Sequence, residues 1–228
     1  MISDAAQPSY FSRAMPFDPA NIGVRPASDV DRDFLRMIFV STRAAEFARS
    51  SLAPAQIDTL LAEQFAMQDT YYRRHYPDAH FDVVTCNKTY APQCVDQAFP
   101  VNAIKRSEVP DFPVGRLYHD WSSGELRVID IALAPSYRGM GIGTRLMHTL
   151  LAEAARRDWA ASLYVEMDNP VCALYRRLGF VKVGENGVYE MMRREAGPFD
   201  LMASGLDGKI DLSLGLRQAP IQPPTRNI

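Results

Sequence analysis

Residues 129–144 read IDIALAPSYRGMGIGT, an apolar strand pattern that passes through Pro135 into glycines at every second position. Glycine has no Cβ, so Gly139, Gly141 and Gly143 allow a tight turn and a close approach of the backbone to a ligand. The pattern that follows is helical, and the first amides of a helix are unpaired donors at the positive end of its dipole. The stretch therefore predicts a strand, a turn and a helix start that would cradle a phosphate or pyrophosphate.

Other interpretations of the same glycines stay open. A tight turn that only needs small residues has the same pattern. A dinucleotide-binding turn is disfavoured, because the glycine spacing differs from that motif and the stretch comes late in the chain, after predicted helices. No lysine follows Gly143 where a P-loop would need one.

Strand and helix patterns alternate on both sides of this stretch, which indicates an α/β domain without internal repeats. Ser28 is a candidate N-cap for a first helix, and Pro54 begins a second helical pattern. The remaining predicted helices are 142–157 and 171–178, and the predicted strands are 22–25, 81–85, 114–119, 126–133, 162–167, 180–183 and 188–192. The strand at 126–133 is expected to be central.

Three segments lie outside this pattern. Residues 1–21 and 195–228 are proline-containing arms, and residues 86–113 are an inserted loop in which prolines interrupt every period. The expected domain is therefore 22–194. The carboxy-terminal arm repeats apolar residues, so we expect it to pack on its own domain or on a second copy, which would make a homodimer.

Composition excludes several classes of protein. The chain has 228 residues, of which 47% are hydrophobic and 23% charged, and no run approaches the roughly 20 apolar residues of a membrane-spanning helix. A formal charge of -2 gives no basic excess for nucleic acid. Three cysteines without metal-ligand spacing predict neither a disulfide framework nor a metal site. Without a secretory pattern at the start, a cytoplasmic location is expected.

Two motifs in order resemble the GCN5-related N-acetyltransferase (GNAT) family. Residues 138–143, RGMGIG, resemble its acetyl-CoA loop, which reads Arg or Gln, two residues, Gly, any residue, Gly or Ala. Residues 169–180, NPVCALYRRLGF, resemble its later segment, with an Asn, a short helix containing Leu-Tyr and a closing Gly-Phe. The resemblance implies a mixed, mostly antiparallel central sheet, splayed at the cofactor site and flanked by helices. It also implies direct transfer of an acetyl group from acetyl-CoA to a primary amine.

The resemblance further implies which residues hold the cofactor. The pantetheine arm would bond main-chain groups of Ala132, Leu133 and Ala134. Asn169 matches a family residue that bonds the same arm, and an Asn that caps the short helix is the alternative. The side chain of the loop arginine is expected mainly as a solvated charge beside the phosphates. The pyrophosphate would lie on the loop formed by Arg138, Gly139, Met140, Gly141, Ile142, Gly143 and Thr144.

Tyr175 occupies the family position of the general acid. A phenol with an ordinary pKa near 10 can protonate a departing thiolate. The alternative is a tyrosine packed in the core. The interval from Asn169 to Tyr175 is one residue shorter than in the ribosomal-protein acetyltransferases, which is a departure from the family pattern.

The general base does not transfer from the family, because Arg127 and Tyr164 stand where members carry glutamates. Asp130 and Glu166 are the nearby acids. Strand alternation puts Asp130 with Val128 and Ala132 on the face opposite Ile129 and Ile131. An Asp paired with an arginine and a base acting through water are the alternatives.

The acceptor remains open among a peptide amino terminus, a lysine, a polyamine and an aminoglycoside. His75 and His80, with Tyr71, Tyr72 and Tyr76, are candidates for lining the acceptor site. Loss of the family glutamates would also suit a non-catalytic acyl-CoA-binding or interaction module of the same fold.

Overall fold

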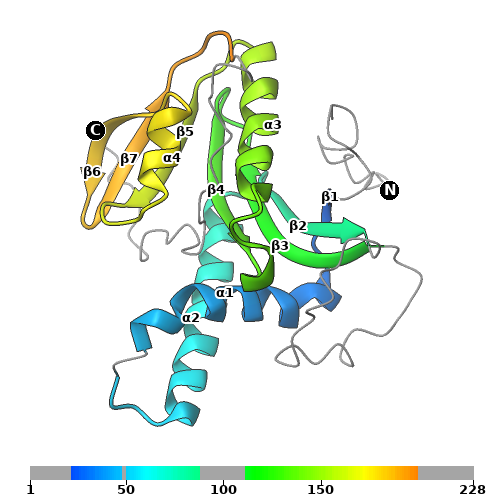
Figure 1. Cartoon of the computed structure of the whole chain (residues 1–228), viewed down its shortest axis with the longest axis vertical. Coiled ribbons are helices and arrows are strands. Elements are labelled where there is room, and N and C mark those ends of the chain that lie inside the picture. The colour runs from blue at the N-terminus through cyan, green and yellow to red at the C-terminus, as the bar shows by residue number, and fades with distance from the viewer. Residues whose placement is uncertain (1–21, 48–49, 88–110, 200–228) are drawn as a thin grey trace.

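The computed structural model describes residues 22–47, 50–87 and 111–199, and Figure 1 shows its elements. The helices are η2 (Asp29–Asp31), α1 (Arg32–Phe47), α2 (Pro54–His75), η5 (Pro135–Tyr137), α3 (Ile142–Arg156) and α4 (Cys172–Arg177). The strands are β1 (Ile22–Pro26), β2 (His80–Asn87), β3 (Asp111–Asp120), β4 (Leu126–Leu133), β5 (Ala161–Glu166), β6 (Val181–Asn186) and β7 (Tyr189–Arg194). The predicted α/β fold is confirmed.

Within the described residues, the strands form one seven-stranded sheet in the order β1-β2-β3-β4-β5-β7-β6. β4 is the middle strand, as predicted. Every neighbouring pair is antiparallel except β4 and β5, which are parallel. In Figure 1, β5, β6 and β7 lie with α4 on one side of β4, and β1 to β3 lie on the other.

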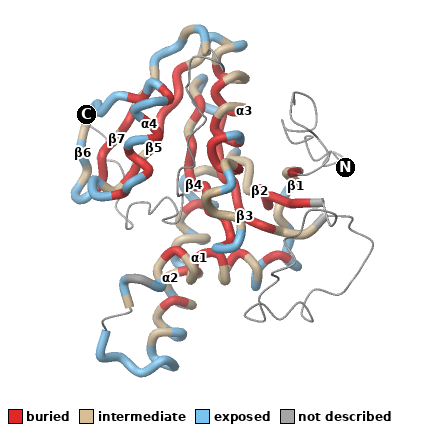
Figure 2. Tube along the Cα trace, viewed as in Figure 1, coloured by how far each residue is buried: buried red, intermediate tan, exposed pale blue. Residues whose placement is uncertain are grey.

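Helices cover both faces of the sheet. The apolar stripe of α3, which includes Leu146 and Leu150, packs on one face in the largest cluster of buried side chains. On the other face, Ile38 of α1 contacts Ala132 of β4, and Tyr72 of α2 contacts Ile129. The strands beneath are buried, whereas the first turn of α2 is exposed (Figure 2). None of the described helices combines the length and apolarity needed to cross a membrane.

The margins of the predicted insertion are wrong. β2 continues to Asn87 and β3 begins at Asp111, so the flanks of 86–113 are strand, and residues 88–110 lie outside the described part of the chain. Pro113 is tolerated inside β3 because the pairing with β2 shifts by one residue between Val84 and Thr85. Such a bulge spares a ladder hydrogen bond that proline cannot donate.

The parallel pair β4–β5 is short. Pairing runs only from Leu126 with Ala161 to Val128 with Leu163, so residues 129–133 of β4 have no partner in β5. The two strands diverge beyond Val128 and leave a gap in the sheet. This is the splayed geometry that the resemblance implies.

A bulge sits at the start of this gap. In the pairing with β3, Tyr118 lies opposite Asp130 and His119 lies opposite Val128, so Ile129 is the extra residue. Ile129 packs with Tyr72 on the α2 face, where Asp130 also bonds Tyr72. The expectation that Val128 shares a face with Asp130 is therefore wrong, since Val128 packs in the α3 cluster. Simple alternation fails wherever a bulge adds a residue.

Candidate active site

The glycine loop follows the end of β4, beyond the β4 residues that have no partner in β5. Gly139 and Gly141 have φ angles of 70° and 78°, a region that favours glycine. A Cβ built on either would meet no described atom within 4 Å, so the backbone angle alone requires glycine and the space beside it is open.

The first amides of α3 face that loop without a side-chain cap. Gly141 is the N-cap and provides no side-chain hydrogen bond, which leaves the N–H groups of Ile142, Gly143 and Thr144 without intrahelical partners. The helix begins at Ile142, the first residue of the predicted range 142–157. Met140 lies between the glycines with 56% of its surface exposed. These three donors lie at the positive end of the helix dipole and can bind an anion.

Arg138 corrects one expectation. Its Nε donates to the carbonyl oxygen of Leu133 at 2.9 Å, and its Nη2 donates to the Ser41 hydroxyl of α1 at 2.8 Å. The side chain therefore ties β4, the loop and α1 together, and it is not simply a solvated charge. The two hydrogen bonds of Arg138 thus fix the position of the loop relative to β4 and α1.

Successive residues at the end of β4 direct their main-chain N–H and C=O groups alternately toward β3 and toward the gap. Ala134 donates its N–H to Val114 of β3 at 2.8 Å. The carbonyl oxygen of Ala132 also points to β3, because a Cβ at Gly115 would come within 2.6 Å of it. Since the hydrogen-bonding side alternates along a strand, Ile131 and Leu133 face the gap. Of the three residues predicted to bond the pantetheine arm, only Leu133 has this orientation, which it shares with Ile131.

Asn169 lies in the turn that leads into α4, whose N-cap residue is Val171. Its Oδ1 accepts the N–H of Val171 at 3.0 Å, and its own N–H donates to the carbonyl oxygen of Glu166 at 3.0 Å. The side chain thus bonds the backbone N–H of the N-cap residue Val171, but it does not cap α4 itself. A bond from Asn169 to a cofactor stays a prediction.

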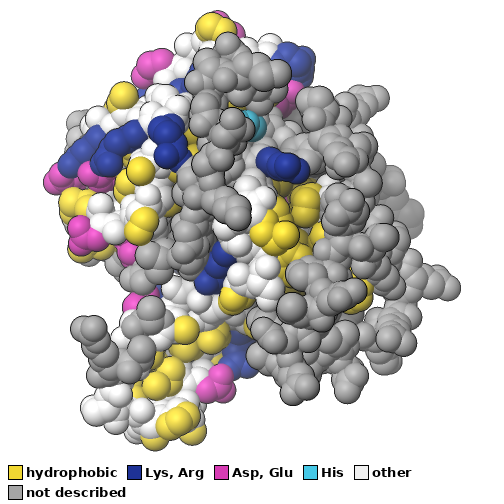
Figure 3. All heavy atoms as spheres, viewed as in Figure 1, with side chains coloured by type: hydrophobic (Ala, Val, Ile, Leu, Met, Phe, Trp, Pro, Cys, Tyr) yellow, Lys and Arg dark blue, Asp and Glu magenta, His cyan; other side chains and the backbone are white. Residues whose placement is uncertain are grey.

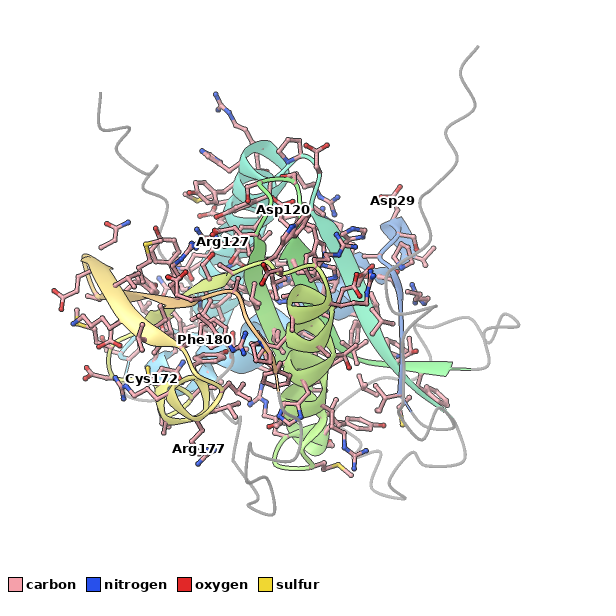
Figure 4. The ribbon with its side chains drawn as sticks, turned by 90° about the horizontal axis from the view of Figure 1, so that it is seen from above. Asp29, Asp120, Arg127, Cys172, Arg177 and Phe180 are labelled. Atoms are coloured by element: carbon pink, nitrogen blue, oxygen red, sulfur yellow. The ribbon has the colours of Figure 1, made fainter. Side chains whose placement is uncertain are left out.

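Tyr175 packs in the core on the α3 side of the gap. It is 2% exposed, and its ring meets Phe180 edge-on at 5.8 Å. Burial raises the pKa of Tyr175 well above its ordinary value, and the charges of Cys172 and Asp130 raise it further. The phenol thus keeps its proton at neutral pH. Figure 4 shows Cys172 and Phe180 together around α4.

Asp130 lies on the opposite face, and it is completely buried. Its Oδ2 accepts a hydrogen bond from Nη2 of Arg116 at 2.7 Å and a long one from the Tyr72 hydroxyl at 3.5 Å. Gln68 accepts a second bond from Arg116 at 3.3 Å. Burial raises the pKa of Asp130, and the charge of Arg116 opposes that rise. The pairing of an Asp with an arginine, one of the alternatives, is realised.

Glu166, the other candidate base, ends β5. Its Oε1 accepts a hydrogen bond from the Tyr189 hydroxyl at 3.3 Å. Burial, and then the negative charge of Glu166, raise the pKa of Tyr189. Glu166 is half-buried, on the same face of β5 as Tyr164.

The predicted acceptor-lining residues separate into two groups. Tyr71 stacks on His75 at 3.9 Å, and burial and Tyr164 of β5 raise the pKa of Tyr71. His80 instead stacks on His119 at 4.8 Å, in a polar cluster of β2 and β3. Tyr72 belongs to the Asp130 cluster. His75 and His80 therefore stack on different partners.

Basic side chains gather over α4 and β6 (Figure 3). Arg176 and Lys182 lie near Glu190, at 3.3 and 3.6 Å, so their positive charge is partly neutralised. This surface is mixed in sign and offers only limited attraction for phosphates.

Arg116 is not among the residues predicted for the site. An arginine two residues before Tyr118, in a predicted strand, is a signal for a buried partner, because an unpaired charge inside a sheet is costly. Its partner could not be assigned from sequence, since the bulge at Ile129 sets the register between β3 and β4.

Comparisons with known proteins agree with this geometry. A sequence profile described as the acetyltransferase (GNAT) family matches residues 63–180, about half of the chain. The streptothricin acetyltransferase of Streptomyces lavendulae is 38% identical over 77 residues, which cover 32% of this chain and 40% of that protein. An uncharacterised protein of Mycobacterium leprae is 41% identical over 81 residues, which cover 32% of this chain and 22% of that protein. The chain thus spans less than half of the length of these two curated relatives.

Solved structures have a similar fold. The PaiA N-acetyltransferase of Thermoplasma acidophilum, in complex with coenzyme A, matches with a TM-score of 0.50 at 16% identity, over 76% of this chain and 98% of that chain. PH1933 of Pyrococcus horikoshii matches with a TM-score of 0.50 at 17% identity, over 78% of this chain and 99% of that chain. At these identities the likeness concerns the fold alone.

Proposed function

The chain belongs to the acetyltransferase (GNAT) family, and we propose that it transfers an acetyl group from acetyl-CoA to a primary amine. The observation that carries the proposal is the gap between β4 and β5, which ends at the glycine loop and the first turn of α3. A thioester with a long arm and a pyrophosphate needs a slot with main-chain partners and a cradle of amides, and here the two are continuous. The coenzyme A complex of PaiA, a structure of the same fold, supports this placement.

The cofactor would be held mainly by the backbone. The amides of Ile142, Gly143 and Thr144 suit the pyrophosphate, and the main-chain groups of Ile131 and Leu133 suit the pantetheine arm. Arg138 keeps its bonds to Leu133 and Ser41 and acts on the cofactor through the position of the loop. Asn169 remains a candidate partner of the pantetheine arm.

Bound acetyl-CoA supplies an activated acetyl carbonyl beside the gap. The amine nitrogen forms the new bond to the carbonyl carbon, and the carbon–sulfur bond breaks with its electron pair on sulfur. Tyr175, which holds its proton at neutral pH, gives that proton to the sulfur. The nitrogen loses a proton as the amide forms, and this proton restores the phenol through solvent.

Two measurements on the full chain test this proposal. Calorimetric titration with acetyl-CoA measures cofactor binding, and a thiol-release assay measures turnover with L-lysine, spermidine, an alanine tetrapeptide and kanamycin as acceptors. We expect binding together with thiol release that depends on one of these amines. Binding without acceptor-dependent release across a wider panel would support the non-catalytic module, and absence of binding would overturn both interpretations.

A further inference from the structure

The buried cluster of Tyr72, Arg116 and Asp130 contains two unpartnered polar atoms. Oδ2 of Asp130 is bonded by Arg116, but Oδ1 has no hydrogen-bond partner among the described residues, and neither has Nε of Arg116. An unpaired polar atom in the interior costs about 1–3 kcal/mol, and more when it belongs to a charged group. A native fold retains such an atom where something else satisfies it, and for Oδ1 this must be a hydrogen-bond donor.

The position of Asp130 suggests what that donor is. Asp130 follows the bulge at Ile129 and lies just past Val128, the last β4 residue paired with β5. It is therefore at the closed end of the gap. Its charge raises the pKa of Tyr175, so the proton donor and this carboxylate influence each other although they belong to opposite faces of the sheet. An acid and a carboxylate on the two sides of one gap form a plausible pair for proton transfer.

Glu166 is less suited to the same task. Its Oε1 already accepts the Tyr189 hydroxyl, and its side chain is half-buried, so water can satisfy it. Asp130 is fully buried, and its Oδ1 is not satisfied within the described residues. Of the two candidate carboxylates, only Asp130 gains a missing hydrogen bond when an ammonium group enters.

Resting on the acetyl transfer proposed above, we propose that Oδ1 of Asp130 accepts the proton of the reacting ammonium, and that Arg116 and Tyr72 are positioning residues that hold Oδ2. The ammonium gives one proton to Oδ1, and the freed lone pair attacks the acetyl carbon. Sulfur leaves with the electron pair of its bond to carbon and takes the proton of Tyr175. The nitrogen's second proton returns to the phenol through solvent, and Asp130 releases its own proton to solvent after the amide departs.

Arg116 then controls when Asp130 can act. Arg116 of β3 and Tyr72 of α2 contact Asp130, and Tyr118 of β3, Arg43 of α1 and Tyr175 of α4 act on it electrostatically. Burial raises the pKa of Asp130, and Arg116 is the largest opposing influence. Replacing Arg116 by a neutral residue should raise that pKa further. The ionised carboxylate, and with it activity, should then require a higher pH.

Three variants separate a chemical role from a structural one. Asp130→Asn and Arg116→Met each leave one buried group without its partner, so both should lower the melting temperature. The double variant Arg116→Met/Asp130→Asn removes both charges and should recover much of that stability. If the pair were only structural, the double variant would also recover turnover. We expect it to be folded, to bind acetyl-CoA, and to remain about 100-fold slower than the parent.

The pH dependence supplies the second readout. With the fastest amine of the acceptor panel, the acid limb of kcat/KM should move to higher pH in Arg116→Met and move back toward the parent position in Arg116→Lys, which keeps a cation. Parent-like turnover in the folded double variant, or an acid limb unmoved by Arg116→Met, would overturn the proposal.

A titration of Asp130 that does not depend on turnover separates failure of this proposal from failure of the proposed function. The carboxyl carbon resonance of Asp130, assigned by its loss in Asp130→Asn, is titrated in the parent and in Arg116→Met with acetyl-CoA bound. If no amine is acetylated although acetyl-CoA binds, the enzyme assignment fails and the proton-acceptor role fails with it. If an amine is acetylated and the carboxyl titration is the same in both proteins, only the role of Arg116 and Asp130 fails.

Discussion

Gly141 meets two requirements of the cofactor loop at once. Its φ of 78° lies where side chains are disfavoured, and no described atom lies within 4 Å of a Cβ built there. A larger residue would therefore extend into the open space where the pyrophosphate should lie. Strain and occlusion are separable, because another glycine has the same backbone requirement at a position away from the cofactor loop. Gly124, in the turn between β3 and β4, has a φ of 74° and equally open surroundings.

We predict that Gly141→Asp weakens acetyl-CoA binding by at least about tenfold, or ~1.4 kcal/mol. The carboxylate would repel the phosphates and compete for the free amides of α3. Gly124→Asp is the matched control, since it introduces the same charge and a similar strain away from the loop. Calorimetric titration of both folded variants checks the prediction, and equal affinities for the two would place the phosphate site elsewhere.

Tyr175 supports a second prediction at this scale. Tyr175→Phe removes the proton donor and keeps the ring that packs on Phe180, so turnover should fall about 10- to 1000-fold with little change in melting temperature or in acetyl-CoA affinity. Thiol release measures the first quantity, and thermal unfolding and calorimetry measure the others. Unchanged turnover would leave Tyr175 as a packing residue.

At the scale of elements, the site depends on how closely β3 approaches β4. Gly115 permits that approach, because a Cβ there would lie 2.6 Å from both the Ala132 carbonyl oxygen and Cδ2 of Leu133. The oxygen belongs to the backbone and cannot rotate away. Any side chain at Gly115 must therefore push the two strands apart, and it would shift the segment that faces the gap.

We predict that Gly115→Ala destabilises the fold by about 1–3 kcal/mol and weakens acetyl-CoA binding. Gly184→Ala in β6 is the control, because its Cβ would meet its nearest neighbour, Cβ of Met191, at an ordinary 3.9 Å. Urea unfolding compares the two. Equal stabilities would show that β3 and β4 can separate without cost.

Sequence could predict most elements because their signals are local. The apolar stripe of α3 and the glycine turn before it are each recognised from residues close together in the sequence. The apolar run of β4 likewise predicts a central strand. The arrangement around Asp130 is not local. It depends on an extra residue in the pairing of β4 with β3, and alternation counted along one strand misses such a bulge.

The same limit applies to the candidate site. The loop could be found because its glycines recur at every second position of one short motif. The contacts of Arg138 could not, because its partner Ser41 lies 97 positions earlier in the chain. Pairing of Arg116 with Asp130 likewise arises only when two strands are in register. Long-range polar contacts therefore decide which residues of a recognised motif touch a ligand and which hold the scaffold.

At the scale of the whole molecule, the domain continues past its last strand. Nη2 of Arg194, the final residue of β7, donates to the carbonyl oxygen of Pro198 at 2.7 Å, and its guanidinium lies 5.2 Å from the ring centre of Phe199. The same ring meets His148 of α3 edge-on at 5.4 Å. The first residues of the predicted arm are thus packed on α3, and residues 200–228 lie outside the described part of the chain.

Two truncations test what this packing contributes. Removing residues 197–228 deletes the Phe199 and Pro198 contacts, whereas removing 200–228 keeps them. We predict that the longer deletion is the less stable of the two by about 1–3 kcal/mol, the usual effect of burying one aromatic side chain, while acetyl-CoA affinity is the same in both. Urea unfolding and calorimetry measure these quantities.

Sedimentation of the same two proteins beside the full chain tests the expected role of the arm in assembly. If the arm joins two copies, the full chain should sediment as a dimer. At least the longer truncation should then sediment as a monomer, because the segment that joins the copies is missing. Equal masses of all three proteins would show that the arm has no role in assembly. Equal free energies of unfolding of the two truncations would show that the contact of Phe199 with α3 does not stabilise the fold. Loss of acetyl-CoA binding in a folded truncation would instead make the arm part of the site, since the contact at His148 lies on the helix whose first turn is the proposed phosphate cradle.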